Sequence, residues 1–363
     1  MDYTGSGELK SVLIHVIRGP SLVILKGSNY NAKIPDFEQA LSPVLTALVN
    51  ANSPVYSIVM AKPPEPCLQN RLNLSSLHTH TKFCDGRDDV ELMCRAAFEK
   101  CLGAIGFSAH APIGKTGIQS NWHLQDERLG DYIEAVYAAR RRWEGKLAVY
   151  LGLECDYIKG LRSALDRDIV GLNVDFIIGS VHYIVPPSGE PFTVDGPIQE
   201  LERGIENSFN GSGEALMHAY WDAVAEMTAL GGFDILGHVD LIKKNNQESR
   251  WFNIESEAYS RRIAETARSL GQAGLAAEIN TGGLNRKRTS DTYPSLAVLR
   301  VFRQNHIPIL ISADAHSAEE LDGNYPAAYK TLLKAGYTEH VLFTGRKDGK
   351  AVWHTEELYS CGE

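Results

Sequence analysis

Between about residue 72 and residue 345, short apolar runs of strand length alternate with segments whose apolar residues recur at helical spacing. The predicted strands are residues 72–77, 104–108, 147–153, 174–178, 234–236, 275–279, 309–311 and 341–343. The predicted helices are residues 90–101, 129–137, 216–227, 254–272, 296–305 and 321–335. About seven or eight strand–helix units are typical of a parallel sheet with crossover helices. The segment has a normal length for a closed barrel, and periodicity alone leaves a doubly wound open sheet as the alternative.

The first 70 residues differ from the rest of the chain. They contain short apolar runs, one plausible helix at residues 35–50 and a proline-rich stretch at residues 61–66. Because such a stretch is typical of a linker, we divide the chain into an N-terminal extension, residues 1–70, and a main domain, residues 71–363. No chemistry is apparent in the extension. One hypothesis is that Met60 is the true start, which would make the upstream residues dispensable.

Composition limits the class of protein. The formal net charge is -9, with 45 acidic and 36 basic residues, and it gives no basic surface for nucleic acid or an anionic membrane. No apolar run approaches the roughly 18 residues of a membrane-spanning helix. The six cysteines include no C-x-x-C pair and do not resemble a disulfide framework, so we expect a cytoplasmic protein. A small anionic substrate remains compatible with this charge, because metal ions and a few local cations can override it.

Side chains of the kinds that bind metals follow six of the predicted strands. In chain order they are His78, His80, Asp85, His110, Glu154, His182, His238, Asp314 and His316. In a parallel barrel, the carboxyl ends of all strands open on one face. We therefore expect these nine residues, which are far apart in the chain, to converge.

The spacing of these residues favours a cluster of divalent metals. In an extended strand His78 and His80 point to the same side and can bind one ion, and Asp314 and His316 repeat this spacing. A carboxylate such as Glu154 can bridge two ions, and the cations relieve repulsion among packed acids. One histidine after a strand is weak evidence, and it is the joint pattern that indicates the metal site. The other histidines are interpreted as core or surface residues: His15, His123, His218, His306, His340 and His354.

Six short segments of the chain resemble the PHP (polymerase and histidinol phosphatase) superfamily. In order they are H-T-H-T-K-F-C-D-G at 78–86, G-L-E-C-D-Y at 152–157, I-G-S-V-H-Y at 178–183, G-H-V-D-L-I-K-K at 237–244, E-I-N-T-G-G-L at 278–284 and S-A-D-A-H at 312–316. The third, fourth and fifth segments resemble the histidinol-phosphatase branch in particular. The resemblance covers roughly residues 72–345 and leaves the first 70 residues outside it.

The resemblance implies an α/β fold, a distorted (β/α)7 barrel similar to a TIM barrel, with a trinuclear metal site. By motif position, the first metal is assigned to His78, His80, Glu154 and Asp314. Glu154 is expected to bridge from the first metal to a second metal, which is assigned to His182 and His238. The third is assigned to Asp85, His110 and His316. Family members bind Zn, Fe or Mn, and the sequence does not choose among them.

Phosphate chemistry follows from the same resemblance. We expect a metal-activated water to attack phosphorus while cationic side chains bind the phosphoryl oxygens. Arg286 and Lys243 are the preferred candidates for those cations, and the weaker candidates are Lys244, Lys287 and Arg288. Asp240 is a candidate general acid for the leaving alkoxide, or a partner that orients a ligand histidine.

The expected reaction is the hydrolysis of L-histidinol phosphate to L-histidinol and phosphate, a reaction of histidine biosynthesis. One alternative is a PHP phosphoesterase that acts on another small phosphate ester, such as a sugar or nucleotide phosphate. An alternative of another class is a metal-binding protein that has no catalytic activity. The intact set of nine ligand residues argues against this alternative. The sequence gives no prediction of the oligomeric state.

Overall fold

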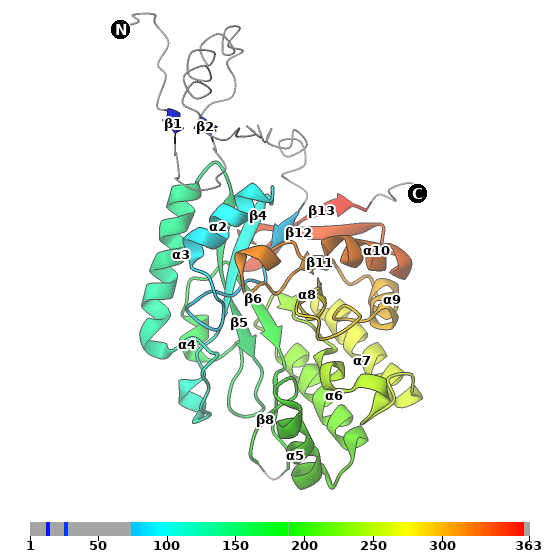
Figure 1. Ribbon diagram of the computed structural model, residues 1–363. Helices are drawn as coiled ribbons and strands as arrows, with labels where there is room; N and C mark the ends of the chain where they lie inside the picture. The colour runs from blue at the N-terminus through cyan, green and yellow to red at the C-terminus, as the bar shows by residue number, and fades with distance from the viewer. Residues whose placement is uncertain (1–11, 15–24, 28–73, 188, 359–363) are drawn as a thin grey trace, which may run out of the picture. The chain divides into compact units, whose positions relative to one another are not determined.

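The computed structural model describes residues 12–14, 25–27, 74–187 and 189–358 (Figure 1). In the N-terminal extension, β1 (Val12–Ile14) and β2 (Leu25–Gly27) form an antiparallel pair. The predicted helix at 35–50, the proposed start at Met60 and the predicted boundary at residue 70 lie outside the described residues.

Seven parallel strands form the central sheet, in the order β11-β10-β9-β6-β5-β4-β3. They are β3 (Ser75–Ser76), β4 (Ala104–His110), β5 (Ala148–Asp156), β6 (Phe176–Ser180), β9 (Ile235–Leu236), β10 (Ala276–Asn280) and β11 (Ile309–Ser312). The two outermost strands meet just beyond their carboxyl ends. There, the backbone N–H of His80 donates to the carbonyl of Ala315 (2.8 Å), and the N–H of Ala315 donates to the carbonyl of His78 (3.0 Å). The sheet is therefore a nearly closed, distorted (β/α)7 barrel, as predicted, and the open-sheet alternative is wrong.

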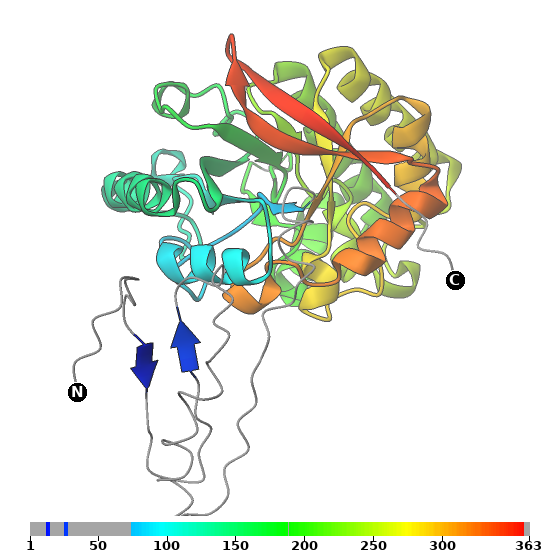
Figure 2. The same cartoon turned by 90° about the horizontal axis from the view of Figure 1, so that it is seen from above.

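Six helices surround the barrel close to their predicted positions (Figures 1 and 2). They are α2 (Val90–Glu99), α3 (Leu129–Trp143), α6 (Gly213–Leu230), α7 (Glu257–Ala273), α9 (Leu296–Gln304) and α10 (Tyr325–Ala335). Local chemistry sets several of their ends. The Asp89 and Ser256 side chains accept hydrogen bonds from the first turns of α2 and α7, respectively. Gly274 ends α7 in the left-handed conformation, with φ 67°.

Several elements were not predicted from the sequence. They are β7 (Tyr183–Ile184), paired antiparallel with β8 (Phe192–Thr193), and the helices α4 (Arg167–Val170), α5 (Ile198–Phe209) and α8 (Gly282–Asn285). Short 3-10 helices lie in the connections: η2 (Gly114–Thr116), η3 (Asp126–Arg128), η4 (Leu241–Asn245), η5 (Gln247–Ser249) and η6 (Ala318–Glu320). Most of these elements are too short for a periodic pattern to appear in the sequence.

The predicted strand at residues 341–343 does not belong to the barrel. It lies in β12 (Glu339–Lys347), which pairs antiparallel with β13 (Lys350–Glu357). Of the seven or eight strand–helix units expected from periodicity, seven therefore contribute strands to the barrel. A run of apolar residues predicts that a strand forms, but not which strand it pairs with.

The β12–β13 hairpin covers the end of the barrel at which the strands begin. Val341 and Phe343 pack in one apolar cluster with inward-facing residues of the strands, including Phe176. Arg346 donates to Oδ2 of Asp234, which immediately precedes β9 (2.8 Å). Figure 2 shows the hairpin in red, lying across the strands. The opposite end of the barrel is left for the polar residues.

Side-chain alternation along the strands brings those polar residues inward. Gly106 and Gly152 face the interior, because a Cβ at either position would collide with the ring of Phe176. Successive side chains of a strand point to opposite faces, so residues separated by an even number of positions face the same way. His110 on β4 and Glu154 on β5 therefore point inward like these glycines. On each of these strands an inward glycine is therefore followed, toward the carboxyl end, by an inward side chain of a metal-ligand type.

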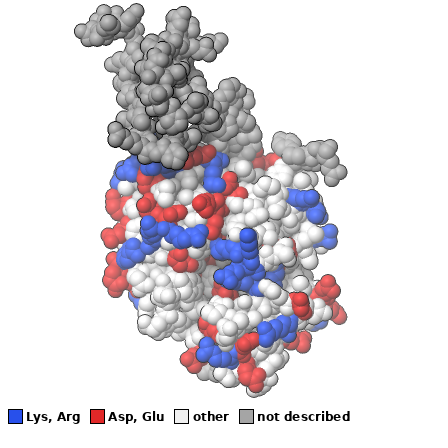
Figure 3. Space-filling view, in the orientation of Figure 1, with Lys and Arg blue, Asp and Glu red and all other residues white. Residues whose placement is uncertain are grey.

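Acidic and basic side chains are interspersed on the face drawn in Figure 3, with one group of Lys and Arg side chains near its centre. Within the described residues, no helix is both long and apolar enough to cross a membrane. The longest of them, α6, has 18 residues and carries Glu214, Asp222 and Glu226.

Candidate metal centre

The polar end of the barrel is organised around Glu154, which is fully buried. Its Oε2 lies 3.1 Å from Nε2 of His78 and 3.5 Å from Nε2 of His80. Oδ1 of Asp314 lies 3.6 Å and 3.2 Å from the same two nitrogens. The structure thus brings the four residues assigned to the first metal around one point.

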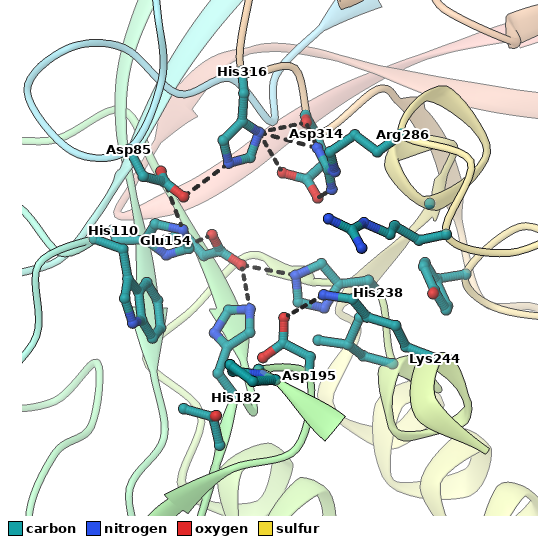
Figure 4. Close-up of a pocket in the computed structure, with 18 of the residues that line it drawn as sticks. Asp85, His110, Glu154, His182, Asp195, His238, Lys244, Arg286, Asp314 and His316 are labelled. Carbon is teal, nitrogen blue, oxygen red and sulfur yellow. Dashed lines mark hydrogen bonds and ion pairs between the residues drawn. The ribbon is translucent and has the colours of Figure 1, made fainter. Parts of the chain in front are cut away.

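The other oxygen of Glu154 faces two further histidines (Figure 4). Oε1 lies 2.9 Å from Nε2 of His238 and 3.6 Å from Nε2 of His182, and it accepts a hydrogen bond from Oγ of Ser180 (2.7 Å). Burial by itself would raise the pKa of Glu154, but the surrounding imidazoles, above all that of His78, hold it well below its usual range. The carboxylate is therefore charged and directs one oxygen to each of two groups of imidazoles.

The three residues assigned to the third metal also lie together, on a more exposed side of the centre. Oδ2 of Asp85 lies 3.1 Å from Nε2 of His316, and its Oδ1 lies 3.7 Å from Nε2 of His110. His80 reaches this group too, with Nδ1 3.6 Å from Oδ1 of Asp85. Although burial opposes it, these imidazoles hold the pKa of Asp85 well below its usual range. All nine predicted ligand residues are thus in one place.

The donor atoms fit a divalent metal. Four of them are buried and have no hydrogen-bond partner among the described residues: Nε2 of His78, Nε2 of His80, Nδ1 of His110 and Oε2 of Glu154. Leaving such atoms unpaired in a protein interior is costly. A tetrahedral ion with bonds of about 2.1 Å holds its ligand atoms about 3.4 Å apart, close to the separations observed here. Imidazole nitrogen and carboxylate oxygen suit Zn, Fe and Mn.

Two buried carboxylates orient the ligand histidines, and neither was predicted from the sequence. Oε2 of Glu278 lies 3.0 Å from Nδ1 of His78, and Oδ1 of Asp156 lies 2.8 Å from Nδ1 of His182. Each contact turns the Nε2 atom of its imidazole toward Glu154. A signal for Asp156 was present, because it follows Glu154 by two residues and so lies on the same side of β5.

His123, interpreted from the sequence as a core or surface residue, is buried and extends this network. Its Nε2 lies 2.9 Å from Oδ2 of Asp156, and its Nδ1 lies 2.7 Å from Oγ of Ser120. The ring of Trp122 lies over it, with centroids 3.8 Å apart, and Trp122 also meets the ring of His110 edge-on. These residues come from an irregular connection that has no periodicity from which their placement could be predicted.

A cavity of about 530 Å³ adjoins the metal centre. This volume is in the usual range for small-molecule sites. Apart from the predicted metal ligands, its wall includes Trp122, Asp195, Glu200, Lys244, Arg286 and Arg288. Figure 4 shows Asp195 and Lys244 on the side of Glu154 opposite to Asp85 and His316.

Arg286 lies in the cavity wall, where the sequence placed it. Its Nη2 donates to Oδ2 of Asp314 (2.7 Å), and its Nη1 donates to the carbonyl of the same residue (2.7 Å). A third of the side chain remains exposed. Arg286 thus holds a predicted metal ligand in place and can also face an anion in the cavity.

Lys243 and Asp240, by contrast, pair with each other outside the lining of the cavity, and their roles stay predictions. Nζ of Lys243 donates to Oδ2 of Asp240 (2.9 Å) and to the carbonyl of Thr292 (2.6 Å). Both side chains are almost fully buried, and neither lines the cavity. The weaker candidate Lys244 lines it instead. The two lysines are consecutive on η4, where neighbouring side chains point in different directions.

Comparison with known proteins places these features in context. A family model described as the PHP domain matches residues 76–282. The chain is similar to a probable histidinol-phosphatase of Deinococcus radiodurans, with 28% identity over 278 residues that cover 76% of this chain and 98% of that protein. It is also similar to the histidinol-phosphatase of Bacillus subtilis, with 25% identity over 271 residues that cover 71% of this chain and 97% of that protein.

Two solved structures share the fold. A putative histidinol phosphatase from Listeria monocytogenes has a TM-score of 0.63 at 21% identity, covering 70% of this chain and 99% of that chain. The histidinol phosphate phosphatase of Lactococcus lactis, in complex with zinc, L-histidinol and phosphate, has a TM-score of 0.56 at 21% identity, covering 77% and 98%. At 21% identity, the similarity to these two structures establishes the barrel fold alone.

Proposed function

We propose that this chain, which belongs to the PHP domain family, is a metal-dependent phosphatase that hydrolyses L-histidinol phosphate to L-histidinol and phosphate. The observation that carries the proposal is Glu154, which is buried among five imidazoles and has a small-molecule cavity beside it. Its own Oε2 and three of the surrounding imidazole nitrogens have no hydrogen-bond partner among the described residues. The relatives from Deinococcus radiodurans and Bacillus subtilis carry the histidinol-phosphatase name. The family and the branch predicted from six short segments are thus confirmed.

Three divalent ions are proposed, with the ligand sets assigned from the sequence. Zn, Fe or Mn would fit the donors, and zinc is present with L-histidinol and phosphate in the Lactococcus lactis protein. When bound, such ions supply an activated water and neutralise phosphoryl oxygens. The chain itself positions the ions through Glu154, holds Asp314 through Arg286, and turns His78 and His182 through their carboxylate partners.

The phosphate group is proposed to lie between the metal centre and the cationic wall of the cavity. Arg286 and Arg288 both line the cavity, and planar guanidinium groups bind phosphoryl oxygens in pairs. His78, His80 and Glu154 have no exposed surface, so the deepest ligands are shielded from bulk water. A cytoplasmic location, predicted from the cysteine pattern, stays a prediction.

Replacing Glu154 with Gln tests the proposal. An amide lacks the charge and the second acceptor oxygen with which Glu154 would hold two ions, so we expect turnover of L-histidinol phosphate to fall by at least about a thousandfold, with less bound metal. Turnover, metal content by atomic emission, and circular dichroism are measured together. Glu134→Gln, on the exposed surface of α3, serves as the control. Full activity in the Glu154 variant would contradict the proposed centre.

The same assay separates the two alternatives. A panel of phosphate esters identifies a PHP phosphoesterase of other specificity if the wild-type protein prefers a sugar or nucleotide phosphate. A metal-loaded protein that hydrolyses none of these esters would instead be a metal-binding protein without catalysis.

A further inference from the structure

One carboxylate in the cavity wall has no cationic partner among the residues that the structure describes. Five acidic residues line the cavity, and four of them have a basic neighbour: Asp85 has His316, Glu154 has its imidazoles, Asp195 has Lys244, and Asp314 has Arg286. The fifth, Glu200, has no Lys, Arg or His nitrogen within 4.0 Å among the described residues. Glu200 lies in the first turn of α5, away from the predicted ligands in the sequence.

The side chain of Glu200 is held in a defined position. Its Oε1 accepts hydrogen bonds from the backbone N–H of Thr193 (3.1 Å) and from the Thr193 hydroxyl (3.0 Å). Gly196 makes this possible, because a Cβ there would collide with the hydroxyl oxygen of Thr193. Oε2 accepts no hydrogen bond from the described residues. One oxygen is therefore fixed by the protein, while the other is available to a ligand.

The charges of the cavity wall differ between its parts. The metal centre with Arg286 and Arg288 attracts the phosphate, whereas Glu200 contributes a negative charge that no described Lys, Arg or His pairs with. Both line one cavity of about 530 Å³, a volume in the range of sites for a single small molecule. A molecule that matches this arrangement carries a phosphate and, a few atoms away, a protonated nitrogen. Phosphate esters of amino alcohols have this chemistry, and phosphate esters of sugars and polyols do not.

We infer that Glu200 is a specificity-determining residue that binds a cationic nitrogen of the leaving alcohol and so selects phosphate esters of amino alcohols. The inference rests on the proposed function, because it takes the phosphate to be bound at the metal centre. A purely structural role is the alternative. An acid in the first turn stabilises a helix, and the contacts with Thr193 fix the chain ahead of α5.

The Glu200→Gln variant distinguishes the two roles. The amide oxygen of Gln can still accept both hydrogen bonds from Thr193, so a structural role is preserved while the charge is removed. We expect kcat/KM for L-histidinol phosphate to fall by about tenfold or more, mainly through KM, because a hydrogen bond between charged groups is lost. For glycerol phosphate, which lacks a cationic nitrogen, we expect kcat/KM to stay within about twofold.

Glu202→Gln is the matched control. It makes the same substitution on α5, but Glu202 pairs with Arg250 (2.7 Å) and does not line the cavity. A binding measurement complements the kinetics. In the Glu200 variant, the inhibition constant of L-histidinol should rise in proportion to the lost kcat/KM, whereas that of inorganic phosphate should not change.

The inference is overturned if the Glu200 variant loses activity equally on both esters, or keeps full activity on L-histidinol phosphate. It is also overturned if the wild-type protein shows no preference for esters with a cationic nitrogen. If the wild-type protein prefers another amino-alcohol phosphate, such as phosphoethanolamine, and the variant loses that preference, the proposed substrate fails while the role of Glu200 stands.

Discussion

Neighbouring residues of one type have different environments in this protein. Lys243 and Lys244 are consecutive, and the sequence favoured the first as a phosphate ligand. The structure buries Lys243 against Asp240, whereas Lys244 reaches the cavity and pairs with Asp195 (3.0 Å). The reason is geometric, because consecutive side chains on a helical segment leave the backbone in different directions.

Because of this difference, we expect the same substitution, Lys to Met, to affect stability at one position and substrate binding at the other. Lys243→Met leaves Asp240 buried without its cation, and burial already raises the pKa of that carboxyl. We therefore expect the free energy of unfolding to fall by about 3–5 kcal/mol. Lys244→Met removes a partly exposed ion pair and should change stability by less than about 1 kcal/mol, while raising KM for phosphate esters. Urea unfolding and steady-state kinetics test the pair, and a stable Lys243 variant with impaired KM would contradict the assignment.

Among the elements, the β12–β13 hairpin shows the limit of strand prediction most clearly. Its apolar residues Val341 and Phe343 pack against the end of the barrel at which the strands begin. The same run of apolar residues would be equally compatible with an eighth strand inside the barrel. The hairpin also buries His340, whose Nδ1 has no hydrogen-bond partner among the described residues. We therefore expect the stability of the hairpin to depend on pH.

Burial lowers the pKa of His340 from 6.5, outweighing the opposing effect of Glu356. The unfolded chain then binds more protons than the folded one, so this residue lowers stability as the pH falls from about 6.5 through the lower folded pKa. We expect the decrease in Tm between about pH 7.5 and pH 5.5 to be smaller in His340→Gln than in the wild-type protein. His354→Gln, on the exposed surface of β13, is the control. Parallel pH profiles for all three proteins would contradict this expectation.

At the scale of the whole molecule, the metal centre joins segments that start at residue 78 and end at residue 316. Closure of the barrel brings His78 and His80 next to Asp314 through the backbone contacts of Ala315. Each metal bound there would therefore connect several barrel strands at once. Ions that bind the folded state alone stabilise it by mass action.

Removing the metals should therefore destabilise the protein as well as inactivate it. At an ion concentration of about 100 times Kd, one site contributes about 2.7 kcal/mol. We expect a strong chelator to abolish phosphatase activity and lower Tm, and Zn, Mn or Fe to restore both. Scanning calorimetry with parallel assays gives the measurement. An active protein with an unchanged Tm in the presence of chelator would exclude the metal centre.

Much of the fold and of the centre was predictable from local features. Strand and helix periodicity is a property of a dozen or so neighbouring residues, and it gave the seven barrel strands and six helices within a few residues. The ligand residues were recognisable because imidazoles and carboxylates directly follow apolar runs. Short segments such as S-A-D-A-H carry family identity in the sequence itself.

The sequence by itself therefore determined the barrel class, the family and the nine residues that converge at its carboxyl end. Only the tertiary structure decided that Glu278 and Asp156 orient histidines, that His123 contacts Asp156, and that Glu200 lines the cavity without a cationic partner in the described part of the chain. These outcomes depend on which side chains meet across large separations in the chain, such as the 200 residues between His78 and Glu278. Periodicity fixes which way a residue faces along its own element, whereas its partner is set by how the elements pack together.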